Sequence, residues 1–201
     1  MAETIGFDYA RVAIIDDKTE KVISGEAGLG DTGVFKIDAP SSDGVISGAI
    51  SGLAPTITKI YGSNQAVGVS GQGAGNVQVT LAVNDLPHEI VAKLGGLKQD
   101  DKGAWYLDTK SVPPFVALEM VSEEKSSHKA VHLCLYKGTF APENRTLQTD
   151  TDQVQRATDS LTFTALNRAS DGRVYAEYWE SDDSSFEQSK LDADVFPGAK
   201  P

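Results

Sequence analysis

Hydrophobic and polar residues alternate along much of the chain, the pattern typical of β-strands that bury one face. The clearest case is residues 77–83, where Val77, Val79, Leu81 and Val83 fall on one face. Further strands are predicted at 11–15, 35–37, 56–61, 116–120, 131–136, 161–165 and 174–179. The pattern therefore predicts a mainly β protein.

Two short polar turns predict hairpins. A turn at 123–127 joins the two predicted strands that flank it. A second turn, 170–173, lies between strands 161–165 and 174–179 and contains Asp171-Gly172. Because Asp-Gly readily supplies the positive φ of a tight connection, we expect these two strands to pair with each other.

One segment, about residues 86–94, follows a helical period instead. Asp85 is the predicted N-cap, Pro87 stands early in the helix and Gly95 stops it. Three apolar residues share one face of this helix: Leu86, Ile90 and Leu94. A second short helix is predicted at about 185–191. The fold class is therefore an antiparallel β-sandwich or barrel-like fold with one flanking helix.

Composition limits the classes of protein that fit. The chain has 201 residues, which favours a single domain over 1–201. Twenty-nine acidic against 18 basic residues give a net charge of −11, which argues against gripping nucleic acid through phosphates. The one cysteine, Cys134, excludes an intrachain disulfide framework.

The tract at about residues 44–83 is almost free of charge. Lys59 is its only charged residue, yet it holds eight of the 19 glycines. One interpretation is a flexible linker. The other is a long hairpin or loop excursion whose surfaces are covered by further copies of the chain, because bare low-charge strand surface invites pairing.

Two sets of residues resemble ligand sites. The glycines at 68, 71, 73 and 75 resemble a phosphate-binding loop, but a strand follows them where a helix is needed, so we interpret them as a hairpin tip. His128, His132 and Cys134 share strand parity and are zinc-ligand types. There are only three candidate ligands, and His128 is expected in the turn. We therefore interpret them as part of a half-buried strand face rather than a metal site.

No catalytic constellation emerges from the sequence. There is no Gly-x-Ser-x-Gly elbow, and the adjacent acids Asp100-Asp101 and Asp182-Asp183 flank turns, where carboxylates are solvated. We predict that the protein is not an enzyme and has no catalytic, metal or cofactor site. No apolar run is long enough to span a membrane and no signal peptide is evident, so we expect synthesis in a cytoplasm.

Several short motifs follow one another along the chain: Gly6-Phe7-Asp8-Tyr9-Ala10, Leu94-Gly95-Gly96, Asp101-Lys102-Gly103, Pro113-Pro114-Phe115-Val116-Ala117-Leu118, Leu135-Tyr136-Lys137-Gly138-Thr139-Phe140-Ala141-Pro142, Thr162-Phe163-Thr164-Ala165 and Asp171-Gly172-Arg173. Their order resembles that of the major tail protein, or tail-tube protein, of long-tailed bacteriophages of Gram-positive hosts. The motifs cover most of the chain in the order of the family.

The resemblance implies a structural virion protein of the phage tail. Copies would form six-fold rings that stack into a tube, and phage DNA would pass through it without specific binding. Tape-measure and tail-end proteins are the further partners that it implies. Within the low-charge tract, contacts between rings or subunits are predicted at Tyr61, Asn64, Val69, Gln72 and Asn76.

Two other functions compete with assembly. Tyr175, Glu177 and Trp179 share a strand face that could stack on sugar rings, which would make the protein an acidic carbohydrate-binding module. Aromatic residues also favour half-buried strand faces, so this signal is weak. A hydrolase ranks third, since it rests on scattered carboxylates only.

Overall fold

The computed structural model describes residues 3–71, 73–142 and 158–200, which form a mainly β body with short helices. The helices are α1 (Ala39–Ser42), α2 (His88–Leu94) and α3 (Gln188–Val195). The strands are β1 (Thr4–Ile15), β2 (Val34–Ile37), β3 (Val45–Ser51), β4 (Thr58–Gly62), β5 (Gln65–Ser70), β6 (Gln78–Val83), β7 (Lys98–Gln99), β8 (Trp105–Tyr106), β9 (Phe115–Glu124), β10 (Ala130–Phe140), β11 (Asp159–Leu166) and β12 (Tyr175–Trp179).

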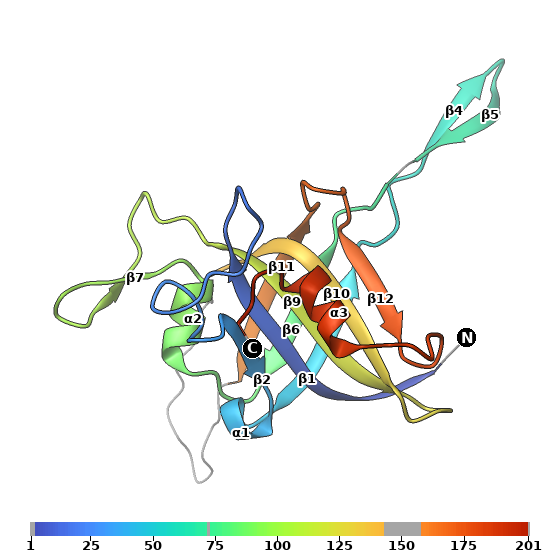
Figure 1. The fold of residues 1–201 in the computed structure, drawn as a ribbon. Coiled ribbons are helices and arrows are strands. Elements are labelled where there is room, and N and C mark those ends of the chain that lie inside the picture. Colours follow the sequence, from blue (N-terminus) through green and yellow to red (C-terminus); the bar gives the residue numbers. More distant parts are fainter. Residues whose placement is uncertain (1–2, 72, 143–157, 201) are drawn as a thin grey trace, which may run out of the picture.

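Eight of these strands make one antiparallel sheet in the order β2-β1-β9-β10-β11-β6-β3, with β12 also paired to β10. The sheet curls, so that β3 at its end comes close to β1 (Figure 1). A Cβ atom on Gly48 of β3 would stand 2.7 Å from Met120 of β9 and 3.1 Å from Phe7 of β1. The predicted mainly β fold class, an antiparallel β-sandwich or barrel-like fold, is confirmed.

Strand β10 pairs with three other strands. One edge pairs with β9, which confirms the hairpin predicted around 123–127. The other edge is shared, because Val131–Leu135 pair with β12 and Lys137–Phe140 pair with β11. The predicted pairing of 161–165 with 174–179 is therefore wrong. The turn between them does form, with Gly172 at φ +76°. However, β12 and β11 pair with successive parts of the 11-residue β10 instead of with each other.

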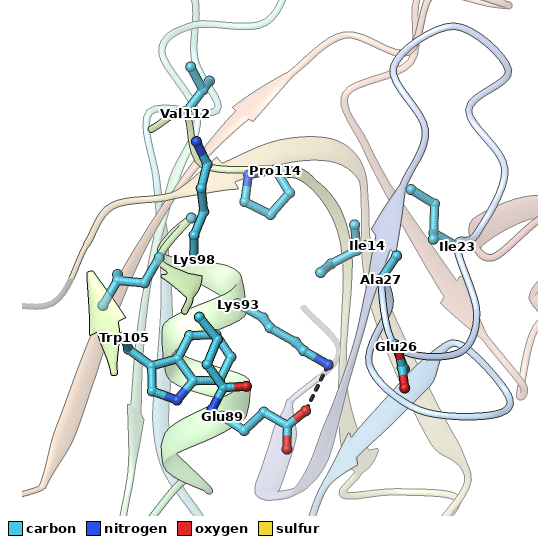
Figure 2. A pocket seen from close by; sticks show the side chains of 13 residues that line it. Ile14, Ile23, Glu26, Ala27, Glu89, Lys93, Lys98, Trp105, Val112 and Pro114 are labelled. Atoms are coloured by element: carbon cyan, nitrogen blue, oxygen red, sulfur yellow. Dashed lines mark ion pairs between the residues drawn. The ribbon is translucent and has the colours of Figure 1, made fainter. Parts of the chain in front are cut away.

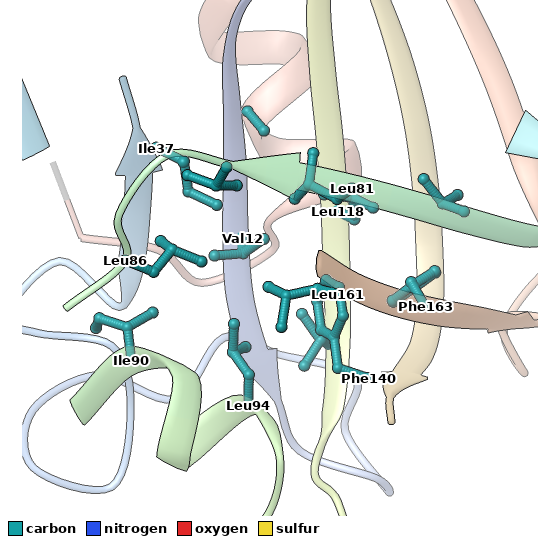
Figure 3. Packing of buried hydrophobic residues seen from close by; sticks show 14 of the residues in the cluster. Val12, Ile37, Leu81, Leu86, Ile90, Leu94, Leu118, Phe140, Leu161 and Phe163 are labelled. Atoms are coloured by element: carbon teal, nitrogen blue, oxygen red, sulfur yellow. The ribbon is translucent and has the colours of Figure 1, made fainter. Parts of the chain in front are cut away.

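Alternation along the central strands builds a core on each face of the sheet. In β1, Val12 and Ile14 enter the larger core while Ala13 and Ile15 enter the smaller one. The larger core also packs strands β6, β9 and β11 against α2 (Figure 3). Its Phe140 and Phe163 rings meet edge to face, with centroids 5.1 Å apart. The smaller core lies under α3 and includes Cys134, Leu191 and Phe196.

Helix α2 has the buried face that was predicted for residues 86–94, but it begins at a different residue. Leu86, Ile90 and Leu94 are all buried, and the helix ends at Gly95 as expected. Its N-cap is Pro87, so the predicted cap at Asp85 is wrong. The amide of Asp85 instead donates to the Ser42 carbonyl, and the Leu86 amide donates to the Asp159 carboxylate at 2.8 Å.

The other helices are short. The helix predicted at 185–191 is α3, which lies about three residues later. Helix α1 was not foreseen; Asp38 caps it by accepting from Ser41, in a capping box. The described residues thus contain three helices: the predicted flanking helix α2, the predicted second helix α3 and the additional helix α1.

Candidate assembly surfaces

Between β3 and β6 the chain leaves the body as a projecting segment, which we call the arm and whose described residues are 53–71 and 73–75. Its two strands, β4 and β5, form a separate two-stranded sheet that extends well beyond the body (Figure 1). The ends of the arm meet at its base, where a Cβ atom on Gly52 would lie 1.9 Å from the Asn76 carbonyl oxygen. Glycine at position 52 therefore lets the outgoing and returning chains leave the body side by side.

The arm turns at Ser63 and Asn64, which have positive φ angles of 51° and 64°. This two-residue connection between Gly62 and Gln65 suits a tight hairpin, and Asn tolerates the left-handed conformation well. The predicted tip at glycines 68–75 is wrong. Gly68 lies inside β5, and Gly73 and Gly75 belong to the returning chain.

The arm exposes apolar side chains on both faces. Its exposed large hydrophobic residues are Leu53, Ile57, Ile60, Tyr61, Val67 and Val69. A lone two-stranded hairpin is only marginally stable in water, and its outer edges leave backbone groups unpaired. Surface of this kind is expected to be covered by another molecule.

The predicted contact residues fall in two places. Tyr61 and Val69 are 69% and 70% exposed on the arm, and Asn64 is at its tip. Asn76 lies at the base, whereas Gln72 is outside the described residues. Sequence reasoning missed Lys59 as a contact candidate. It lies directly across from Val69 and two residues before Tyr61, so all three share one face of the arm.

A second projection, residues 97–112, which we call the lobe, extends from the opposite side of the body (Figure 1). It carries the short β7–β8 hairpin, and Trp105 packs edge to face on His88 of α2 with ring centroids 6.1 Å apart. Gly96 closes its base with φ +77°, because a Cβ there would stand 2.8 Å from the Pro113 backbone. Tyr106, Leu107 and Val112 are exposed on or beside this hairpin.

A pocket of about 710 Å³ opens between the lobe, α2 and the loop after β1. Figure 2 shows Trp105, Lys98 and Val112 on one side and Ile23, Ala27 and Glu26 on the other. Both lysines at the pocket are already paired. Lys93 contacts Glu89 at 2.8 Å and donates to the Gly28 carbonyl, and Lys98 lies 3.5 Å from Asp108.

Charged groups fasten α3 to the sheet. Arg11 of β1 donates to the fully buried Glu119 of β9 and to Asp192 of α3. Burial alone lowers the pKa of Arg11, but these two carboxylates outweigh it and raise that pKa. On the other side of Glu119, Nδ1 of His132 lies 2.8 Å from its Oε1, while the His132 ring stacks on Phe186.

A second cluster joins α3 to the turn before β12. Arg168 pairs with both Asp171 and Asp194, at 2.6 and 2.9 Å. The hydrogen bond from Arg168 lowers the pKa of Asp171 to about 2. Tyr136 and Tyr178 donate to Asp194; burial and that hydrogen bond raise the pKa of Tyr178. These contacts are structural, since they lock the helix to the sheet.

The three residues weighed as zinc ligands have different surroundings. Cys134 is buried in the core under α3, where burial raises the pKa of its thiol. His132 contacts Glu119, and His128 is exposed in a turn beside Glu123. Within the described ranges, no three His, Cys, Asp or Glu side chains form a group that could hold a metal ion.

The polar groups of the aromatic residues on β12 form hydrogen bonds within the molecule. Tyr175 donates to Glu177 at 2.6 Å, and the Trp179 indole donates to the same carboxylate at 3.2 Å. Tyr175 also packs against the larger core, and burial together with this hydrogen bond raises its pKa. The arrangement is that of a half-buried strand face.

A β body with an exposed, low-charge arm is the architecture expected of a subunit that assembles with other chains. The family model for phage tail tube proteins matches residues 1–201, so the chain belongs to the phage tail tube protein family. No curated protein matches the chain.

Membership makes the protein a structural component of the virion tail and not an enzyme. It self-assembles into the tail tube alongside other tail proteins. Among the described residues, none of the helices has the length and apolar character needed to cross a membrane.

Proposed function

We propose that this subunit forms six-membered rings that stack into the tail tube, and that phage DNA passes through the bore without specific binding. The exposed arm is the observation that carries the proposal. It presents six large apolar residues to solvent and has two unpaired strand edges. Contact with a neighbouring copy buries this surface and provides partners for the edges.

The arm and the surface that it contacts are different parts of the molecule, so the contact is heterologous. A heterologous contact makes a closed ring when its rotation closes, and an open-ended stack when it does not. We assign contacts between rings or subunits to Tyr61, Asn64, Val69, Gln72 and Asn76. Because the tract contains one charge, covering it costs little desolvation of charged groups.

The net charge of −11 suits a conduit for DNA. Acidic side chains on the bore would repel a polyanion, and at physiological salt this repulsion reaches only about 8 Å from the wall. DNA would therefore pass without being held. Tape-measure and tail-end proteins are the partners that we expect to start and end the tube.

Removal of the arm tests the proposal. In the test variant, Asn-Gly replaces residues 53–75 and joins Gly52 to Asn76, which already lie side by side. The control keeps the arm and carries Lys200→Ala on the exposed C-terminal segment. Negative-stain microscopy and light scattering should show rings or tubes for the wild type and control, and for the variant a folded monomer lighter than the 21.4 kDa full-length chain. Tubes formed by the armless variant would overturn the role of the arm.

A further inference from the structure

Exposed apolar surface gathers at the two projections on opposite sides of the body (Figure 1). Among the described residues, 12 large hydrophobic side chains are exposed, of which six belong to the arm and three to the lobe. The arm extends away from the body on one side and the pocket lies beside the lobe on the other, so an arm does not reach the pocket of its own molecule. A contact between these surfaces requires a second copy.

The pocket has apolar side chains on two facing sides. Ile23 and Ala27 face Trp105 and Val112 across a space of about 710 Å³ (Figure 2). Val112 is 77% exposed at its rim. These apolar side chains stand among charged ones, Glu26, Glu89, Lys93 and Lys98, so the pocket can bury residues such as Tyr61 and Val69 and also pair with a charge.

Charge favours the same pairing. Lys59 is exposed, and within the described chain no acidic side chain lies at ion-pair distance from it. Glu26 is exposed at the pocket, and among the described residues it too has no ion-pair partner. Since Lys93 and Lys98 are engaged elsewhere, Glu26 leaves an unpaired negative charge at the rim.

We propose that the pocket of one copy receives the face of the arm formed by Lys59, Tyr61 and Val69 from another copy, with Lys59 paired to Glu26. This inference rests on the proposed assembly and names the surface that accepts the arm. Each copy gives one arm and accepts one, so the contact repeats from subunit to subunit. Apolar residues around the ion pair strengthen its Coulomb attraction, which offsets the cost of desolvating both charges, and they make a mismatched charge at either position unfavourable.

Charge reversal tests the pairing in the full-length protein. Lys59→Glu and Glu26→Lys each place like charges together, and each should raise the concentration for half-maximal assembly by about tenfold or more. The double variant restores opposite charges and should return to within about threefold of the wild type. Lys200→Glu, which changes the net charge equally at a distant exposed site, should assemble like the wild type.

Two results would overturn the acceptor assignment: single reversals that assemble normally, or a double variant as defective as the singles. Either result, together with an armless variant that fails to assemble, leaves the proposed function standing and shows that the arm binds elsewhere. If the armless variant forms tubes, the role proposed for the arm fails as well. The armless variant therefore separates the two failures.

Discussion

The arm and the body belong to one chain, but the body buries its large apolar residues and the arm exposes them. In the body, Phe140 and Phe163 are fully buried between the curled sheet and α2. On the arm, Tyr61 and Val69 are about 70% exposed, although they too lie on paired strands. The difference indicates that the body supplies the free energy of folding, while the apolar surface of the arm remains for contacts between molecules.

The largest effect should follow from opening the larger core. Phe163→Ala removes a fully buried ring that packs on Phe140, so we expect a loss of about 3–5 kcal/mol in the free energy of unfolding. Val69→Ala on the arm is the matched control and should change it by less than about 0.5 kcal/mol. Urea unfolding of both variants measures the contrast, and equal losses would contradict the division between body and arm.

The next largest effect concerns the buried charges under α3. Glu119→Ala leaves Arg11 and His132 without their shared carboxylate, so we expect a loss of about 3 kcal/mol. Glu119→Gln keeps the shape and part of the hydrogen bonding and should cost less. A Glu119→Ala protein as stable as the wild type by thermal unfolding would show that this network does not hold α3 in place.

A smaller, pH-dependent effect is expected at Asp171. Its folded pKa of about 2 lies below the ordinary 3.8, so its contribution is complete above about pH 4 and disappears as the pH falls toward 2. Because the side chain is partly exposed, Asp171→Asn should cost less than about 1 kcal/mol at pH 6. Urea titrations from pH 6 to 2 should show this difference vanishing. In an Arg168→Gln background, Asp171→Asn should have no comparable effect.

The smallest effect on overall stability should come from the arm tip. Glycine adopts a positive φ more readily than Asn does, so Asn64→Gly should stabilise the hairpin by about 0.5 kcal/mol, whereas the β-branched Asn64→Val should weaken it. Hydrogen exchange should slow in β4 and β5 for the first variant and accelerate for the second. Exchange in β10 should not change, and a change there would mean that the arm and body unfold together.

Local patterns predicted most of the elements. Alternation located β6, β9, β10 and β11, and helical spacing found the buried face of α2. The partners of the strands were harder to predict. Asp171-Gly172 signals a turn, but nothing nearby shows that β10 is long enough to hold β12 and β11 in succession. Likewise, Asp85 is a residue type that often caps helices, but its amide donates a hydrogen bond to the carbonyl of Ser42, 43 positions earlier in the chain.

Of the two proposed contact surfaces, the sequence predicted the arm but not the pocket. The low charge of residues 44–83 marked the tract of the arm, because composition is a local property. The pocket could not be found from the sequence, since it brings together the loop after β1, α2 and the lobe. Lys59 stood out as the one charge in its tract, but only the register of β4 on β5 places it beside Val69.

By itself, the sequence determined the β class, the main helix, the low-charge tract and the resemblance to tail tube proteins. These follow from periodicity, composition and motif order, which act over a few residues at a time. The tertiary structure decided the shared edge of β10, the opposite directions of the arm and the lobe, and the pocket between distant segments. Those features depend on which distant surfaces pack together, and side-chain alternation within one strand does not specify its neighbour.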